Sequence, residues 1–262
     1  MAGEFSGKVV VVTGGSRGIG RAIALAFARK GAQTVLASSS ENNLAAASKM
    51  IKQAGGSEPF TVAGDLRTLA ACEQVFNKVR ERFGRCDILV NNAGATRAGA
   101  FVTLPDEAWM DGYALKFFGC VRMCRLFWPL LKEAKGTVIN IVGGAARTPD
   151  PEFSIGASVN AAMANFSKGL SKLGNRDDVN VNVIHPGTTE TERTIQLAQQ
   201  RAAALGTTPE EMRAKSLAKD GLRRIGQPED IAELAVFLAS ERARHIQGQA
   251  IAVDGGSTPG YY

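Results

Sequence analysis

The chain has 262 residues, of which 45% are hydrophobic and 21% charged, and this composition is typical of a globular protein rather than a disordered one. Its 29 glycines follow no three-residue period, which excludes a collagen-like chain. No apolar run reaches the ~18 residues needed to span a bilayer, and the first residues do not resemble a secretory leader, so we expect a cytoplasmic protein.

The charged and metal-binding residues argue against two further classes of function. The net charge is +6, but the basic residues are scattered, and the densest clusters, at 80–82 and 242–244, accompany no nucleic-acid-binding motif. We therefore expect no nucleic-acid partner. The four cysteines and two histidines lack the spacing of a zinc site, so we expect reduced, buried thiols and no metal.

Short apolar runs alternate with longer helical segments along the whole chain. Seven strands are predicted at 9–12, 34–37, 60–63, 88–90, 138–142, 179–184 and 250–253. Helices are predicted at 19–29, 41–54, 69–83, 106–132, 158–173 and 230–239. Because several runs are apolar at consecutive positions, the strands suit a parallel sheet covered on both faces. The alternation predicts an open, doubly wound α/β sheet.

We expect a single domain over residues 1–262, since neither a repeat nor a linker rich in proline and serine divides the chain. One long region without a strand, about 188–227, holds two helix-like stretches at 191–205 and 209–219. Long insertions in compact domains usually serve function. This insertion is therefore predicted to be a lid over a site at the carboxyl ends of the strands.

The first predicted strand runs directly into a glycine-rich turn, TGGSRGIG at 13–20, and a helix of small and apolar residues follows. Glycines let the backbone approach a pyrophosphate closely, and a helix N-terminus offers free N–H groups and partial positive charge. A glycine turn between a strand and a helix predicts a dinucleotide-binding site.

Four motifs in this order resemble the short-chain dehydrogenase/reductase family: TGxxxGxG at 13–20, NNAG at 91–94, PG at 186–187 and DGG at 254–256. The likeness extends over about residues 5–257. It implies a Rossmann-like, doubly wound α/β fold with seven parallel strands flanked by helices on both faces. It also implies NAD(P) binding and an assembly that is usually a homotetramer.

The resemblance and the glycine turn together give a set of expected cofactor contacts. Asp65 resembles the family's adenine contact, Asn91 its sheet-bracing residue, and Thr189 and Thr191 its contacts to the nicotinamide and phosphate. The full set is Gly14, Ser16, Arg17, Gly18, Ile19, Gly20, Ser38, Asp65, Leu66, Asn91, Ala93, Gly94, Pro186, Gly187, Thr189 and Thr191.

The second strand points to the kind of dinucleotide. It is followed by serines at 38–40 and lacks the acid that would hold the adenosine ribose hydroxyls of NAD. Arg17 resembles the basic residue that accompanies the 2′-phosphate in members that use NADP, and a guanidinium binds phosphate with two parallel hydrogen bonds. We therefore expect NADP, with NAD as the alternative; Arg17 could also be a solvated surface residue.

The residues of the family's catalytic tetrad are missing from the expected positions. The family uses a Tyr as the acid, a Lys four residues later, a Ser about thirteen residues before the Tyr, and an Asn on the preceding helix. None of Tyr113, Tyr261 and Tyr262 is followed by Lys at the fourth position. Alignment on the neighbouring motifs places four other residues at these positions: Lys116 for Asn, Gly143 for Ser, Gly156 for Tyr and Asn160 for Lys.

These replacements predict that ordinary carbonyl reduction is absent or slow, because loss of proton transfer alone costs about 10²–10⁴-fold. One hypothesis is a non-catalytic, dinucleotide-binding subunit beside an active paralogue. The alternative is an NADP-dependent oxidoreductase or a non-redox enzyme on the same fold, with Lys116 or His185 as the catalytic residue. Desolvation could lower the pKa of Lys116 and make it an acid or base, or Lys116 could simply fill space; His185 could carry protons or be structural.

The helices at 106–132 and 158–173 also indicate assembly. The first carries an apolar set at Met110, Phe117, Phe118, Met123, Phe127 and Trp128. In the family that this chain resembles, the corresponding helices form a four-helix subunit interface. The resemblance therefore implies a homo-tetramer, or a hetero-oligomer with a related subunit.

Overall fold

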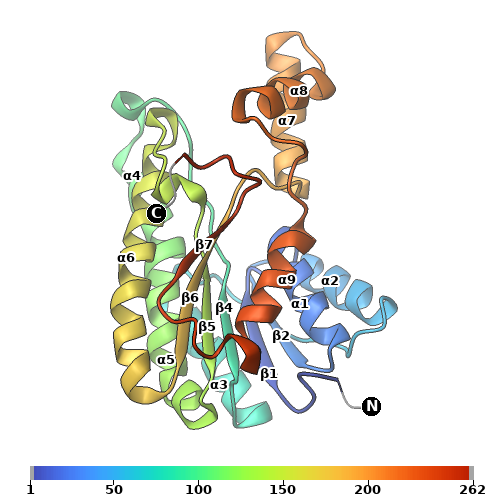
Figure 1. The fold of residues 1–262 in the computed structure, drawn as a ribbon, viewed down its shortest axis with the longest axis vertical. Helices are drawn as coiled ribbons and strands as arrows, with labels where there is room; N and C mark the ends of the chain where they lie inside the picture. The colour runs from blue at the N-terminus through green and yellow to red at the C-terminus, as the bar shows by residue number, and fades with distance from the viewer. Residues whose placement is uncertain (1–2, 260–262) are drawn as a thin grey trace.

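The computed structural model describes residues 3–259, except for the side chains of residues 200, 201, 204 and 219. Tyr261 and Tyr262 lie outside the described residues. Seven parallel strands form one sheet in the order β3-β2-β1-β4-β5-β6-β7 (Figure 1). The strands are β1 Val9–Thr13, β2 Gln33–Ser38, β3 Phe60–Ala63, β4 Ile88–Asn91, β5 Thr137–Ile141, β6 Asn180–Pro186 and β7 Ala250–Val253.

The strand order confirms the predicted doubly wound sheet. In β1, Val11 pairs with Val35 of β2 on one side and with Leu89 of β4 on the other. The chain order therefore reverses direction across the sheet between β1 and β4. In open α/β sheets such a switch point leaves a crevice beyond the carboxyl ends of the strands.

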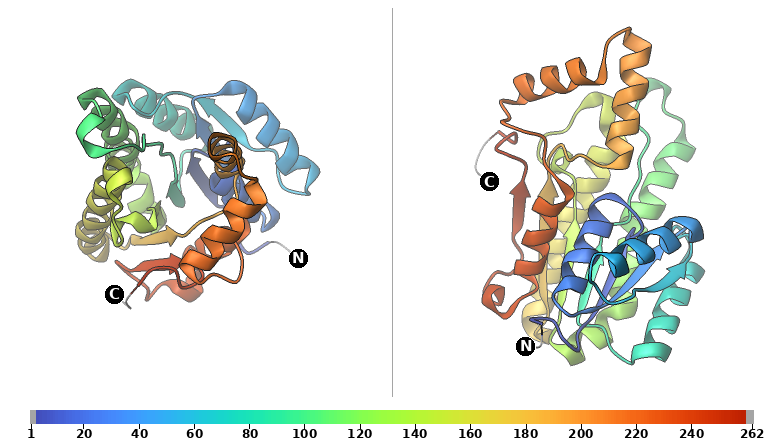
Figure 2. Two further views of the ribbon diagram at one scale, coloured as in Figure 1. Left: turned by 90° about the horizontal axis from the view of Figure 1, so that it is seen from above. Right: turned by 90° about the vertical axis from the view of Figure 1, so that its right-hand side faces the viewer.

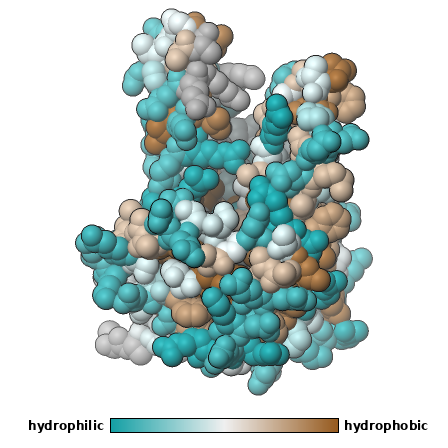
Figure 3. Space-filling model, turned by 180° about the vertical axis from the view of Figure 1, so that it is seen from behind, coloured by the Kyte–Doolittle hydropathy of each residue, from teal (hydrophilic) through white to brown (hydrophobic). Residues whose placement is uncertain are grey.

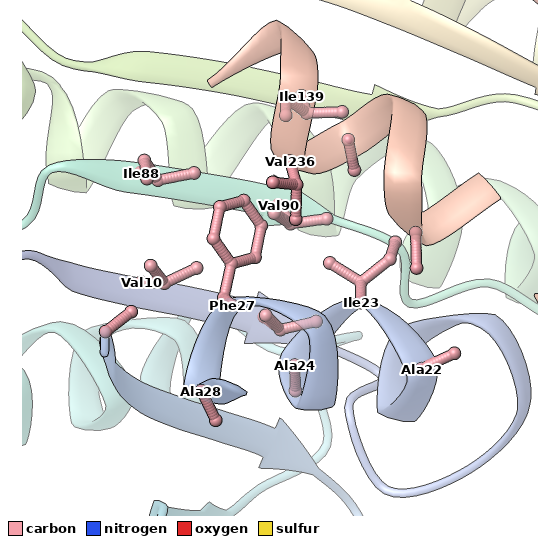
Figure 4. Close-up of a cluster of buried hydrophobic side chains, with 14 of the residues drawn as sticks. Val10, Ala22, Ile23, Ala24, Phe27, Ala28, Ile88, Val90, Ile139 and Val236 are labelled. Atoms are coloured by element: carbon pink, nitrogen blue, oxygen red, sulfur yellow. The ribbon is translucent and has the colours of Figure 1, made fainter. Parts of the chain in front are cut away.

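One face of the sheet is covered by α1 (Gly18–Arg29), α2 (Glu41–Gln53) and α9 (Pro228–Leu238). Figure 4 shows Phe27 of α1 between Val10 of β1 and Val90 of β4, with Ile23 of α1 and Val236 of α9 nearby. All five side chains are buried. Alternate residues of β1 thus supply this core, while their neighbours supply the core of the opposite face.

The opposite face is covered by α3 (Leu69–Phe83), α5 (Gly119–Ala134) and α6 (Ser154–Asp177), so that helices flank both sides of the sheet (Figure 2). Its core is formed by Val9 and Val11 of β1 with Val75, Met123 and other apolar side chains of these helices. The four cysteines are free and buried, as predicted: Cys72, Cys86, Cys120 and Cys124. None of the described helices has the length and apolarity that a bilayer-spanning segment needs.

The helix predicted at 106–132 differs from the structure in one respect. It comprises α4 (Asp106–Gly112), a π-helical segment Tyr113–Phe118 and then α5. A π-helical turn fits an extra residue into a helix and thereby changes which side chains face the sheet. In this chain the π-helical segment carries Lys116.

Between β6 and α9 the chain forms two helices, α7 (Glu192–Leu205) and α8 (Pro209–Asp220), which stand above the carboxyl ends of the strands (Figures 1 and 2). Each begins with a capping box, at Thr191 and at Thr208. Thr189 and Gly226 pair as a short parallel bridge that joins the two ends of this insertion. The helices were predicted at nearly the same residues.

Candidate active site

A pocket of about 490 Å³ lies at the carboxyl ends of the strands, at the β1–β4 switch point. In the space-filling view the molecule is hollowed between its two upper lobes, one of which carries α7 and α8 (Figure 3). The glycine turn after β1, the loops after β2 to β6 and the first turn of α7 all contribute lining residues. Parallel strands bring these loops together because their carboxyl ends share one edge of the sheet.

The glycine positions of this turn have no room for side chains. Gly14 and Gly18 have φ values of +64° and +51°, a region that glycine tolerates and most other residues avoid. A Cβ added at Gly20 would lie 2.3 Å from the carbonyl oxygen of Gly14. At its glycines the turn therefore presents backbone to the pocket, and α1 begins directly behind it at Gly18.

A carboxylate already lies at the N-terminus of α1. The Gly18 N–H donates to Glu192 Oε2 at 3.1 Å, and the Arg21 guanidinium donates to the other carboxylate oxygen. Burial opposes ionisation, but the hydrogen bonds and the charge of Arg21 hold the pKa of Glu192 below its usual value. Glu192 thus occupies a place that suits a negatively charged group, as helix N-termini generally do.

The far end of the pocket is polar. Ser16 and Ser38 are joined by a hydroxyl–hydroxyl hydrogen bond of 2.9 Å, and the exposed Arg17 lines the pocket beside them. Arg67, which the sequence did not single out, donates to Asp65 at 3.1 Å and also to Asp111. Asp65 is therefore engaged with an arginine at the rim of the pocket.

The NNAG motif fixes the floor of the pocket. The Asn91 side chain is buried and donates to Asn140 Oδ1 at 2.8 Å, which braces β4 against β5. The Asn92 side chain donates to the carbonyls of Thr13 and Gly14 at 3.1 and 3.2 Å. Asn92 was also missed by the sequence analysis, although the motif containing it was recognised. Its hydrogen bonds hold the glycine turn in position.

The positions aligned with the family's Ser, Tyr and Lys lie together at the β5–α6 side of the pocket. The Gly143 N–H donates to Asn160 Oδ1 at 2.8 Å. A Cβ added at Gly156 would lie 2.1 Å from the ring of Phe153. Asn160 is therefore used for a backbone hydrogen bond, and the Phe153 ring fills the volume beside Gly156.

Lys116 lines the pocket, and its alkyl chain crosses the backbone of Gly94, where an added Cβ would lie 2.9 Å from the lysine Cδ. Desolvation, and then the positive charge of Arg193, lowers the pKa of Lys116 to about 8. Arg193 lies on the first turn of α7 and donates to the carbonyl of Thr96 at 3.4 Å. Within residues 3–259 the structure shows no ion pair for either cation.

The structure does not bring His185 into this pocket. Its side chain is buried, and Nδ1 lies 2.7 Å from the carbonyl oxygen of Val142. Desolvation by burial lowers its pKa, which favours the neutral form of the ring. Tyr113 is also absent from the pocket lining; its ring contacts Phe117.

Thirteen of the sixteen expected cofactor residues line the pocket, and three do not. Gly20 packs behind the turn, Asn91 braces the sheet, and Thr189 lies in the bridge at the base of the insertion. The bare glycine turn, the N-terminus of α1 and the serine pair fit a dinucleotide with phosphate groups, whereas the carboxylate of Glu192 would compete with phosphate for that N-terminus. No group of three or more His, Cys, Asp or Glu side chains able to hold a metal occurs in the described part of the chain.

Comparisons with known proteins agree with this architecture. Residues 14–258 match the family model described as enoyl-(acyl carrier protein) reductase. The 3-oxoacyl-[acyl-carrier-protein] reductase FabG of Escherichia coli is 33% identical over 255 residues, covering 97% of this chain and 98% of the relative. FabG of Thermotoga maritima is 30% identical over 258 residues, with coverage of 97% and 98%.

Two solved structures extend the comparison. L-sorbose reductase from Gluconobacter frateurii, complexed with NADPH and L-sorbose, superposes with a TM-score of 0.95 at 33% identity and covers 100% of both chains. A variant of actinorhodin polyketide ketoreductase with NADPH superposes with a TM-score of 0.92 at 27% identity, covering 99% of this chain and 100% of that one. The likeness therefore includes α7 and α8 as well as the sheet.

Proposed function

Because the chain belongs to the short-chain dehydrogenase/reductase family, we propose that it binds NADP(H) in the pocket but lacks tyrosine-dependent carbonyl reduction at an ordinary rate. The observation that carries the second half is the Phe153 ring, which occupies the volume beside Gly156 where the family's tyrosine would project. The protein is an oxidoreductase by family, but a fold does not fix an activity, which depends on the residues of the site.

Several features support NADP(H) as the ligand. The two similar structures described above were solved with NADPH. In this chain the glycine turn and the N-terminus of α1 would hold the pyrophosphate, and Arg17 with Ser16 and Ser38 would hold a 2′-phosphate. Thr191 and Pro186 would lie along the nicotinamide half. When bound, NADPH supplies a hydride; the chain's residues bind and orient it.

The loss of ordinary reduction follows from the side chains at the four tetrad positions. Glycine at 143 and 156 offers no hydroxyl to a substrate oxygen, and Asn160 is bonded to the Gly143 N–H. A missing acid and a missing oxygen donor remove contributions that are usually worth several orders of magnitude in rate. The pocket thus keeps the elements for dinucleotide binding without the family's proton donor.

A second candidate is an enzyme of altered chemistry in which Lys116 replaces the missing acid. This candidate is favoured by the position of Lys116 in the pocket and by its pKa of about 8. An ammonium group with such a pKa can give up and regain a proton near neutral pH. His185 is the weaker choice, since it lies outside the pocket lining.

The insertion and the exposed helices have proposed roles in closing the pocket and in assembly. We propose that α7 and α8 act as a lid on a single domain, with the Thr189–Gly226 bridge at its base. We also propose a homo-tetramer or a hetero-oligomer with a related subunit. Exposed apolar side chains at Met110 and Phe118 support such an assembly, and light scattering with native mass spectrometry would measure it.

Calorimetric titration with NADPH and NADH tests the binding half. Replacement of Arg17 by Gln should weaken NADPH binding about tenfold or more, because charge-assisted hydrogen bonds contribute about 1.5–3 kcal/mol, and should leave NADH binding unchanged. Arg29→Gln, on the far end of α1, serves as the control. Equal and weak binding of both dinucleotides to the wild-type protein would contradict the NADP preference.

Turnover of a panel of ketones and alcohols tests the catalytic half. We expect rates well below ~1 s⁻¹, the lower end of ordinary enzyme turnover. Turnover above that value for the wild-type protein would contradict the proposed impairment. If the activity were then lost in Lys116→Met, the second candidate would be supported in its place.

A further inference from the structure

The charged residues of the pocket do not balance one another. Two acids line it, and both are engaged: Asp65 with Arg67, and Glu192 with Arg21 and the Gly18 N–H. Three cations of the lining have no carboxylate partner among the described residues, namely Arg17, Lys116 and Arg193. Arg17 lies at the serine end of the pocket. Lys116 and Arg193 therefore form a second positive region.

This second region brings together separate parts of the chain. Lys116 comes from the π-helical segment, and Arg193 from the first turn of α7. The Lys116 alkyl chain lies against Gly94, and the Arg193 guanidinium donates to the carbonyl of Thr96, so both cations lie beside the loop that follows β4. The charge of Arg193 accordingly contributes to the lowered pKa of Lys116. The acid next to Arg193 in the sequence, Glu192, points to α1 instead. Two neighbouring cations without a carboxylate partner repel each other. An anion bound between them in the pocket would relieve this repulsion.

The surroundings leave room for a ligand at this place. Lys116 and Arg193 both line the pocket of about 490 Å³, which is large enough for a small molecule. An ammonium and a guanidinium together offer several N–H donors, and the planar guanidinium matches the two oxygens of a carboxylate. A neutral carbonyl compound would leave the repulsion between the cations uncompensated.

We propose that Lys116 and Arg193 form a carboxylate-binding subsite, so that the small molecule taken by this pocket is an oxo acid or hydroxy acid rather than a neutral ketone. The inference rests on the proposed function only for the neighbouring dinucleotide. Because Arg193 belongs to α7 and Lys116 to the body of the protein, a bound carboxylate would also tie the insertion to the pocket floor.

Calorimetry with a matched pair of probes tests the subsite. 4-Oxopentanoate and its methyl ester, which differ in the charge of the carboxyl group, are titrated into the protein with and without saturating NADP. We expect the anion to bind at least about tenfold more tightly than the ester, since hydrogen bonds to charged groups are about twice as strong as neutral ones. Lys116→Gln and Arg193→Gln should each remove about tenfold of that affinity, whereas Arg125→Gln, an exposed arginine on α5, should not.

A proton-linked readout identifies Lys116 directly. Since the pKa of Lys116 is about 8, binding of an anion should raise it and draw in protons at pH 8–9. Titrations in two buffers with different ionisation enthalpies measure this uptake. The uptake should vanish in Lys116→Gln and persist in Arg125→Gln.

The other outcomes separate a failure of the inference from a failure of the proposed function. Equal affinity for the ester, or unchanged affinity in both variants, would exclude a carboxylate subsite. If 4-oxopentanoate bound only without NADP, while the two variants weakened NADP itself, the phosphates of the dinucleotide would be the anion recognised. The proposed function would then stand and the inference fail. If NADP did not bind at all, the proposed function would fail, and titration of the dinucleotide-free protein would still decide the inference.

Discussion

The two sides of the pocket differ in whether backbone or side chains form them. On the glycine-turn side, recognition depends on backbone: Gly14 and Gly20 leave no space for side chains, and Asn92 holds the turn. On the β5–α6 side, the family's chemistry depends on side chains that this chain does not have. There Phe153 fills the volume beside Gly156, and Asn160 bonds the backbone.

Dinucleotide binding and catalysis can therefore be separated within one fold. A site made of backbone is part of the fold, so it cannot be altered without disturbing the packing around it. A site made of side chains can lose its chemistry while the neighbouring residues repack. The two sides therefore differ in their proposed functions because the glycine-turn side depends mainly on backbone, whereas the family's chemistry on the β5–α6 side depends on side chains.

Substitution in the glycine turn should have the largest effect. In Gly20→Ala the new methyl group would lie 2.3 Å from the Gly14 carbonyl oxygen, a backbone atom that cannot move freely. We expect a loss of about 2–4 kcal/mol in the free energy of unfolding and a loss of NADPH binding. Urea unfolding and calorimetry measure the two effects.

The matched control is Gly169→Ala in α6, where an added Cβ meets nothing within 4 Å among the described atoms. It should raise stability by about 0.5–1 kcal/mol, since alanine is the better helix former. Similar effects for both substitutions would show that the turn is not sterically closed.

The β5–α6 side can be tested at Gly156, with a smaller effect. This residue lies in α6, where alanine would ordinarily stabilise, yet an added Cβ would lie 2.1 Å from the Phe153 ring. We expect Gly156→Ala to cost about 1–2 kcal/mol in the wild-type background, because the ring must leave its place. In the Phe153→Ala background the same change should become neutral or stabilising. Thermal unfolding of the four proteins gives the coupling energy.

A coupling near zero at this pair would mean that the ring moves aside freely. The volume beside Gly156 would then be open to a tyrosine-sized group, and the observation behind the proposed loss of reductase activity would be removed. The β5–α6 side of the pocket would then have room for the family's tyrosine.

Lys116 gives a prediction of intermediate size that depends on pH. Its pKa is lowered from 10.5 to about 8 in the folded protein, chiefly by desolvation. Below pH 8 the Lys116 amine is charged in both the folded and the unfolded state, and the desolvation of this charge destabilises the folded state. Between pH 8 and 10.5 the unfolded chain binds a proton that the folded protein has released, so the stability contributed by this group rises with pH.

Lys116→Met should therefore be more stable than the wild-type protein at pH 7, by about 1 kcal/mol after allowance for its partial exposure. The advantage should shrink as the pH rises from 8 to 10.5. Urea unfolding of both proteins across this range measures the difference, with the exposed Lys49→Met as the control. A constant difference would mean that Lys116 is not desolvated in the pocket.

The sheet was predictable because its strands are buried on both faces and appear as consecutive apolar runs. The π-helical segment at 113–118 was not, since hydrophobic periodicity does not reveal one extra residue in a turn. The predicted helix at 158–173 begins instead at Ser154, so Gly156 lies inside it.

The candidate site was predictable only where local motifs define it. The glycine turn and the NNAG motif located most of the pocket. The contact between Gly18 and Glu192 joins residues 174 positions apart, and only the fold brings them together. The burial of His185 depends equally on packing: its ring is held against the Val142 carbonyl between β5 and β6.

The smallest expected effect concerns Glu192, a side chain of α7 that reaches the glycine turn. Its carboxylate is held at the N-terminus of α1 by the Gly18 N–H and Arg21, where a pyrophosphate would be expected to bind. Glu192→Gln keeps the size of the side chain and removes the charge that competes with phosphate. Since a charge at a helix N-terminus contributes about 0.3–1 kcal/mol, NADPH affinity should rise about two- to fivefold. Glu190→Gln, which loses contacts to Arg213 and Gln227 outside the pocket, is the matched control. Weaker NADPH binding in Glu192→Gln would mean that the carboxylate orients α7 and Arg21 for the dinucleotide, and the two sides of the pocket would then be less separable than their construction suggests.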